Sequence, residues 1–138
     1  TPHDSVDGVA FVVEDQKHRV GILTDLGHAF DGLRDVLRSL DAVVIESNYD
    51  TKMLEDGPYP EHLKLRISGD GGHLSNEDSA MLLKQTKTER LQWACLCHLS
   101  EENNEPARAR ETHREILGDD FPVHVASRYD VSDLLELQ

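Results

Sequence analysis

Short apolar runs alternate with helix-like segments along most of this chain. Three runs have the length and composition of strands, and the first two read as buried strands: DAVVIES at 41–47, LQWACLCHLS at 91–100 and FPVHVAS at 121–127. Two of the segments between these runs carry signals of a helix start. Residues 76–86 have acids in the first turn, and residues 105–118 have a proline in the first turn. Strands that alternate with helices in this way predict a layered α/β domain.

The amino-terminal part departs from this alternation. Two β-rich runs, GVAFVVED at 8–15 and HRVGILTD at 18–25, are joined by a short polar turn and predict a hairpin. The spacing of apolar residues then predicts a helix within 30–40. Residues 48–60 are expected to be irregular because a glycine and two prolines interrupt them, and 61–68 is expected to be a short helix.

Length and charge limit the functions open to the chain. The 138 residues fit one domain with a buried core, and the formal net charge is −13. The electric field of this negative charge repels phosphate backbones at long range, which argues against non-specific nucleic-acid binding. Bound divalent cations could still let a local site accept a phosphodiester. No apolar run approaches the roughly 18 residues of a membrane span, so we expect a soluble protein that does not bind membranes.

The start of the chain and its cysteines bear on its compartment. TPHDSVDGVAF has neither an initiating methionine nor the features of a signal peptide, so we expect a truncated start and no export. Cys95 and Cys97 would point to the same face of a strand, a poor placement for a disulfide. Buried free thiols in a reducing cytoplasm are therefore expected.

Polar residues capable of metal chemistry lie where strands begin or end. Asp25 follows one predicted strand, His98 follows another, and His3 precedes the first. Imidazole and carboxylate together suit zinc, manganese or iron, whereas thiolate sites would use the cysteines. Each residue also has a simpler reading: a turn cap for Asp25, a hydrogen-bonded strand end for His98 and a solvated terminus for His3. Only the fold can bring them together, because they are far apart in the sequence.

The glycine-rich stretch SGDGGHLSNEDSA at 68–80 could simply turn the chain, or it could hold His73 near a substrate. Ser75 or Asn76 can cap the helix that follows. The remaining histidines are weaker candidates for a site. Three of them are expected at the surface, His18, His62 and His113. His124 is expected to be structural within a strand, and His28, near Asp25, is expected only to line the loop.

Several motifs resemble a known family when taken in order: TPHD, ILTDLG, VIESNYDTKMLEDGPYPEHLKLRISGDGGHLSN and CHLSEENN. They are similar to the second half of small bacterial hydrolases of the metallo-β-lactamase fold, in the branch related to ribonuclease Z and the cyclic phosphodiesterases. The resemblance covers residues 2 to about 130. It implies an αββα sandwich with a two-metal site at one edge, of which 1–138 would be the carboxyl-terminal portion.

The resemblance also implies roles for individual residues. His3, Asp25 and His98 would be metal ligands, with Asp25 bridging two divalent ions, zinc first and manganese second. His73 would act on the scissile phosphate or the leaving group without binding metal. Ser75 and Asn76, in the same loop, would contact the substrate.

Two departures from the family pattern stand out. The signature H-x-H-x-D-H belongs to the first half of these proteins and is absent here. Tyr49 stands where relatives usually have histidine.

The function implied is that of a cytoplasmic metal-dependent phosphodiesterase or nuclease, which attacks DNA or RNA with a hydroxide bridging two metals. The segment alone would be nearly inactive and would pair with a missing amino-terminal half or with its own copies. The alternatives are a non-catalytic fragment or interaction domain, and a thioester or glyoxalase-type hydrolase on the same fold.

Overall fold

A five-stranded mixed sheet forms the centre of the chain in the computed structural model, which describes residues 10–26, 32–69 and 72–138. The strands lie side by side in chain order: β1 Phe11–Glu14, β2 Arg19–Leu23, β3 Ala42–Glu46, β4 Trp93–Cys97 and β5 Val123–Val125. β1 pairs with β2 in the antiparallel sense, and β2 to β5 pair in parallel. The predicted hairpin and the three further predicted strands are thus confirmed; β3 and β4 are mostly buried, and β5 is partly buried.

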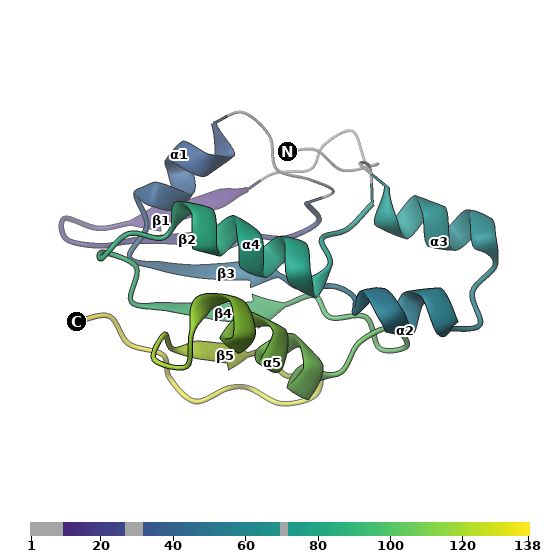
Figure 1. Cartoon of the computed structure of the whole chain (residues 1–138). Helices are drawn as coiled ribbons and strands as arrows, with labels where there is room; N and C mark the ends of the chain where they lie inside the picture. The colour runs from purple at the N-terminus through teal and green to yellow at the C-terminus, as the bar shows by residue number, and fades with distance from the viewer. Residues whose placement is uncertain (1–9, 27–31, 70–71) are drawn as a thin grey trace.

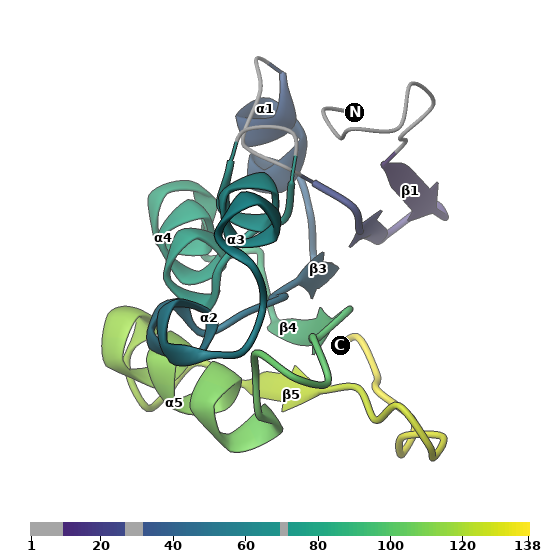
Figure 2. The same ribbon diagram turned by 90° about the vertical axis from the view of Figure 1, so that its right-hand side faces the viewer.

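The described helices lie on one side of this sheet (Figures 1 and 2). They are α1 Leu33–Arg38, α2 Thr51–Asp56, α3 Glu61–Ser68, α4 Asn76–Thr86 and α5 Pro106–Leu117. The helices expected within 30–40, 61–68, 76–86 and 105–118 are confirmed over the residues described. The expectation that 48–60 is irregular is wrong over α2, because the Asp50 carboxylate caps that helix by accepting from the Met53 amide at 2.9 Å.

The hydrophobic core fills the space between the sheet and the helices. Leu23, Val43, Ile45, Ala94 and Leu96 are fully buried on the helix-facing side of β2, β3 and β4. Gly21 lies on the same side of β2, and a Cβ there would lie 2.6 Å from Cδ1 of Leu40, so a larger residue would require the Leu40 side chain to shift. This close approach lets the chain after α1 pack flat against the strand.

No described helix covers the opposite face of the sheet (Figure 2). On β1 and β2, Phe11 is 58% exposed, Val13 60% and Ile22 38%. Phe11 and Ile22 are direct partners across the hairpin, so these side chains form one apolar patch. We call Phe11, Val13 and Ile22 the open face. A layered domain ordinarily buries such a face against a further layer.

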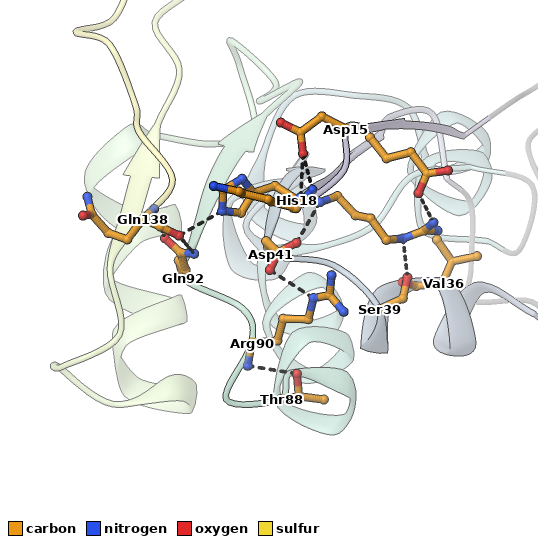
Figure 3. A network of polar contacts seen from close by, with 12 residues as sticks. Asp15, His18, Val36, Ser39, Asp41, Thr88, Arg90, Gln92 and Gln138 are labelled. Carbon is orange, nitrogen blue, oxygen red and sulfur yellow. Dashed lines mark hydrogen bonds and ion pairs between the residues drawn. The ribbon is translucent and has the colours of Figure 1, made fainter.

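Polar contacts fix the amino-terminal end of the parallel strands (Figure 3). The Asp41 carboxylate, just before β3, accepts from the Arg19 amide at 2.7 Å and from Nε of Arg90 at 3.0 Å. At the chain terminus, the Gln138 amide donates to the Gln92 side chain at 2.8 Å. The site described below lies at the other edge of the sheet, where the parallel strands have their carboxyl ends.

Candidate functional site

Four ionisable side chains meet at the carboxyl edge of the parallel strands. Asp25 lies two residues after β2, Glu46 is the last residue of β3, and His98 follows β4. His73 reaches the same place from the loop before α4. Each side chain offers one ligand atom, and these four atoms lie within 4.8 Å of one another. Residues 73 positions apart in sequence are thus brought together by parallel pairing.

The backbone at Asp25 and His98 is in the left-handed region, with φ of 57° and 55°. Among the described residues, these are the only non-glycine positions with positive φ. The conformation is unfavourable for residues with a Cβ, and it persists in folded proteins mainly where a site requires it. This outlier favours a functional role for both residues over a simple turn or strand end.

Glu46 holds both histidines by its side chain. Its Oε1 atom lies 3.0 Å from Nδ1 of His73 and is also bonded to Nδ1 of His98, while Oε2 accepts from the Leu74 amide at 3.2 Å. The carboxylate has no exposed surface. Burial by itself would raise the pKa of Glu46, but the hydrogen bonds from His73 and His98 outweigh it and lower that pKa. Glu46 is therefore an ionised acceptor that orients two imidazoles.

His98 is more accessible, with 43% of its side chain exposed. The hydrogen bond to Glu46 raises the pKa of His98, against the opposing effect of burial, and the negative charge of Asp25 adds to the rise. Asp25 Oδ1 lies 3.4 Å from Nδ1 of His98. The histidine therefore stands between two carboxylates, an environment that stabilises positive charge, whether of a proton or of a metal ion.

Cys97 is next to the cluster in sequence but is a poor ligand. Burial, followed by the negative charge of Glu46, raises the pKa of the Cys97 thiol to about 12. Cys97 is also not among the four side chains whose ligand atoms meet in the cluster. Cys95 and Cys97 are both free, as the sequence predicted.

The glycine-rich loop presents His73. The His73 amide donates to the carbonyl of Ile67 at 2.9 Å, which folds the loop back onto the end of α3. A Cβ on Gly72 would lie 2.2 Å from that same carbonyl, so only glycine fits. The loop both turns the chain and places an imidazole in the cluster.

Ser75 and Asn76 have structural contacts in the same loop. The Ser75 hydroxyl accepts from the Asp78 amide at 3.0 Å and caps α4, which confirms the predicted cap. Asn76 has no exposed surface, and its side chain bonds to Ser47 and Asn104. The predicted contacts of Ser75 and Asn76 with a substrate remain a prediction.

A second amide, Asn48, connects the loops of the two histidines. Its backbone N–H donates to Leu74 at 2.9 Å, its side chain donates to the His98 carbonyl at 2.7 Å, and its carbonyl accepts from Ser100 at 2.7 Å. Tyr49, the next residue, is 4% exposed and pairs with Ser75 through its backbone. Tyr49 is not among the four clustered side chains and supports the loop instead.

The structure brings three of the predicted site residues together in the cluster. Asp25, His73 and His98 come together, while His3 and His28 lie outside the described residues. Sequence reasoning missed Glu46, because the residue stands at the end of an apolar run. The available signal was its position at the end of a strand, as for Asp25 and His98. His113 was expected at the surface, but this is wrong: it is fully buried, because it lies one turn after Ala109 on the side of α5 that faces Ser79 of α4.

The donor set fits a divalent metal ion. The cluster offers imidazole and carboxylate groups, which zinc and manganese accept, and a buried carboxylate bonded to histidines, as Glu46 is, is the usual support for ligating imidazoles. No described helix is long and apolar enough to cross a membrane.

Comparison with known proteins identifies relatives of the chain. It is 32% identical to exodeoxyribonuclease YycJ of Bacillus anthracis over 129 residues, which are 88% of this chain and 49% of that protein. It is 36% identical to exodeoxyribonuclease WalJ of Streptococcus pneumoniae (strain D39 / NCTC 7466) over 143 residues of alignment, covering 98% of this chain and 53% of that protein. The chain therefore spans about half the length of these curated relatives. No family model matches the sequence.

A solved structure shares the fold. It is described as a new diphosphatase from the PhnP family, superposes with a TM-score of 0.50 at 18% identity, and covers 86% of this chain and 36% of that one. The resemblance expected from the sequence is confirmed by these comparisons. The chain shares the metallo-β-lactamase fold that the resemblance predicted, and over most of its length it is similar to the exodeoxyribonucleases YycJ and WalJ.

Proposed function

We propose that the complete protein, meaning this chain with the further length that its relatives have, is a metal-dependent phosphodiesterase that cleaves DNA. The observation that carries the proposal is the meeting of Asp25, Glu46, His73 and His98 at one edge of the sheet. The names of the exodeoxyribonuclease relatives support DNA as the substrate. RNA is the second candidate by the same chemistry.

Asp25 and His98 would hold the metal in this proposal, with His3 as a further ligand and Asp25 shared between two ions. Zinc is the first candidate and manganese the second, because both accept imidazole and carboxylate. A divalent ion at such a site stabilises charge on the phosphoryl group and activates water near neutral pH. The free thiols of Cys95 and Cys97 fit the reducing cytoplasm as the compartment.

His73 would donate a proton to the departing oxygen. Its Nδ1 atom lies 3.0 Å from Oε1 of the buried Glu46, a contact that would orient the ring and leave Nε2 to act on the departing oxygen. A positioned general acid of this kind typically contributes about 10²- to 10⁴-fold in rate. Glu46 would be a positioning residue, because it acts through the two histidines.

The open face supports the proposal that another segment completes the domain. Phe11, Val13 and Ile22 expose apolar surface on a strand pair that no described helix covers. A second sheet in the further length that the relatives have, with the H-x-H-x-D-H motif that the resemblance implies, would bury them and add metal ligands. The same surface favours one alternative, an interaction module that binds its own copies or another protein without catalysis.

Hydrolysis by the complete protein tests the proposal. Wild type, Asp25→Ala and the control Asp35→Ala, which changes an exposed residue of α1, are assayed on labelled single-stranded DNA and on bis(p-nitrophenyl) phosphate. We expect wild type and Asp35→Ala to cleave both substrates in a metal-dependent way, and Asp25→Ala to lose this activity. Full activity of Asp25→Ala would contradict the metal assignment, and no hydrolysis by wild type would favour the interaction module.

A further inference from the structure

A cavity of about 500 Å³ opens beside the cluster and is outside the roles given so far. His98 lines it at one end, and the rest of its wall comes from the loop after β4, from α5 and from the segment after β5. The volume is within the usual range of small-ligand sites. Since His98 belongs to both, a molecule held at the cluster can extend directly into the cavity.

Two guanidinium groups line this cavity. Arg128 donates from Nη2 to the Leu99 carbonyl at 2.9 Å, and among the described residues its guanidinium forms no ion pair. Arg110 is exposed on α5, and within the described part of the chain its side chain makes no hydrogen bond or ion pair. In a chain of net charge −13, two unpaired cations beside a candidate phosphodiester site form a local anion-binding surface.

The cavity also offers apolar and aromatic surface. Tyr129 is 78% exposed, and Val125 lies in the same wall. The Tyr129 hydroxyl donates to Oε1 of Glu101 at 3.0 Å. This hydrogen bond restrains the ring and gives a donor to the carboxylate of Glu101, which also lines the cavity. A fixed, exposed ring is a surface on which nucleic-acid bases stack without sequence preference.

We propose that this cavity binds the nucleotide adjacent to the scissile phosphate, with Arg110 and Arg128 on its phosphate and Tyr129 against its base. The inference rests on the proposed function and names the part of the substrate that lies next to His98. It makes the enzyme selective for a nucleic-acid strand over a small phosphodiester that has no neighbouring nucleotide. The strand is single at this point, because a paired base would not be free to stack on Tyr129.

The test compares two substrates in the complete, metal-loaded protein. kcat/KM is measured for a single-stranded oligonucleotide and for bis(p-nitrophenyl) phosphate, in wild type, Arg110→Ala, Tyr129→Ala and Tyr129→Phe. Arg114→Ala is the matched control, because Arg114 is exposed in the last turn of the same helix and does not line the cavity. The small diester reports whether the reacting centre is intact.

Arg110→Ala is expected to lower the ratio of the two kcat/KM values, oligonucleotide over small diester, about tenfold, mainly through KM. It should also reduce the slope of log KM against log salt by about one, the mark of a lost phosphate contact. Tyr129→Ala should lower the ratio by about tenfold, and Tyr129→Phe should restore most of it because the ring remains.

Distinct results would overturn this inference and the proposed function. An active enzyme whose ratio and salt slope are unchanged in Arg110→Ala and Tyr129→Ala refutes the nucleotide site alone. A fall in Arg114→Ala as large as in Arg110→Ala would refute it too, since the effect would be one of general charge. A wild-type protein that hydrolyses neither substrate overturns the proposed function and the inference with it.

Discussion

Nδ1 of His73 lies 3.0 Å from Oε1 of Glu46, and the same oxygen is bonded to Nδ1 of His98. One buried carboxylate oxygen thus orients two imidazoles from different loops. The arrangement separates the roles of the residues. Asp25 and His98 are the more exposed groups, whereas Glu46 is enclosed and acts through its neighbours.

Glu46→Gln tests this supporting role in the complete protein. The amide keeps the size of the side chain but removes the charge on which both histidines depend. We expect metal affinity or kcat to fall about 10- to 100-fold, the range typical of residues that support metal-binding histidines. Chelator competition measures affinity, and Glu111→Gln, at an exposed position of α5, is the control. Unchanged affinity and rate would show that the contact is incidental.

His73→Ala separates catalysis from metal binding. If His73 protonates the departing oxygen, the rate should fall about 10²-fold or more while bound metal is unchanged. A substrate with a p-nitrophenolate leaving group should be affected less than one with an alkoxide, because it needs less help to depart. His62→Ala, on an exposed site of α3, should match wild type. Loss of metal in His73→Ala would instead make His73 a ligand.

His113 predicts a pH dependence of stability that is independent of the site. Burial lowers the pKa of His113 to about 4, although a hydrogen bond to the Ala109 carbonyl opposes the shift. A histidine with a depressed pKa favours folding fully above its unfolded pKa near 6.5, and this contribution is lost as the pH falls toward 4. The difference between the unfolded pKa of 6.5 and the folded pKa of about 4 corresponds to about 3 kcal/mol of unfolding free energy.

His113→Gln checks this prediction, because glutamine can keep both polar contacts without titrating. Denaturation midpoints of wild type should fall more steeply than those of the variant between pH 6.5 and 4. His62→Gln changes an exposed histidine and should behave as wild type. Parallel curves for wild type and His113→Gln would show that His113 does not titrate in this range.

The chain of 138 residues alone should associate and turn over substrate negligibly. The open face has no described helix over it, and at most three of the proposed metal ligands are present. Sedimentation should show oligomers that Val13→Lys weakens and that Leu65→Lys, at a 63% exposed position on α3, leaves unchanged. Adding the missing segment as a separate chain should raise both zinc binding and activity. A monomeric, zinc-loaded and active chain would refute the need for a second part.

Local patterns predicted most of the secondary structure, because apolar spacing and helix-start signals act over a few residues. The exception is α2, which begins after the Asp50 cap and ends at Asp56, before the glycine and the prolines that suggested an irregular segment. His113 was misplaced because a charged helix does not reveal from its own sequence which stripe another helix will cover. Its neighbour Ser79 lies 34 positions away.

The candidate site was predicted in part. Asp25 and His98 could be found because strand ends in a layered α/β domain are common ligand sites. Glu46 required the sheet register, in which it pairs with Cys97 and so lies beside His98. The cavity next to His98 was beyond prediction, because its walls come from three segments that only the tertiary fold assembles.

Bound metal in the complete protein tests the central claim most directly. Mass spectrometry should find stoichiometric zinc or manganese in wild type, clearly less in Asp25→Ala and His98→Ala, and an unchanged amount in His73→Ala and in the control His62→Ala. The variants must keep the circular dichroism spectrum of wild type, so that loss of metal is not loss of fold. Metal-free wild-type protein with full phosphodiesterase activity, or Asp25→Ala and His98→Ala proteins with undiminished metal, would contradict the account.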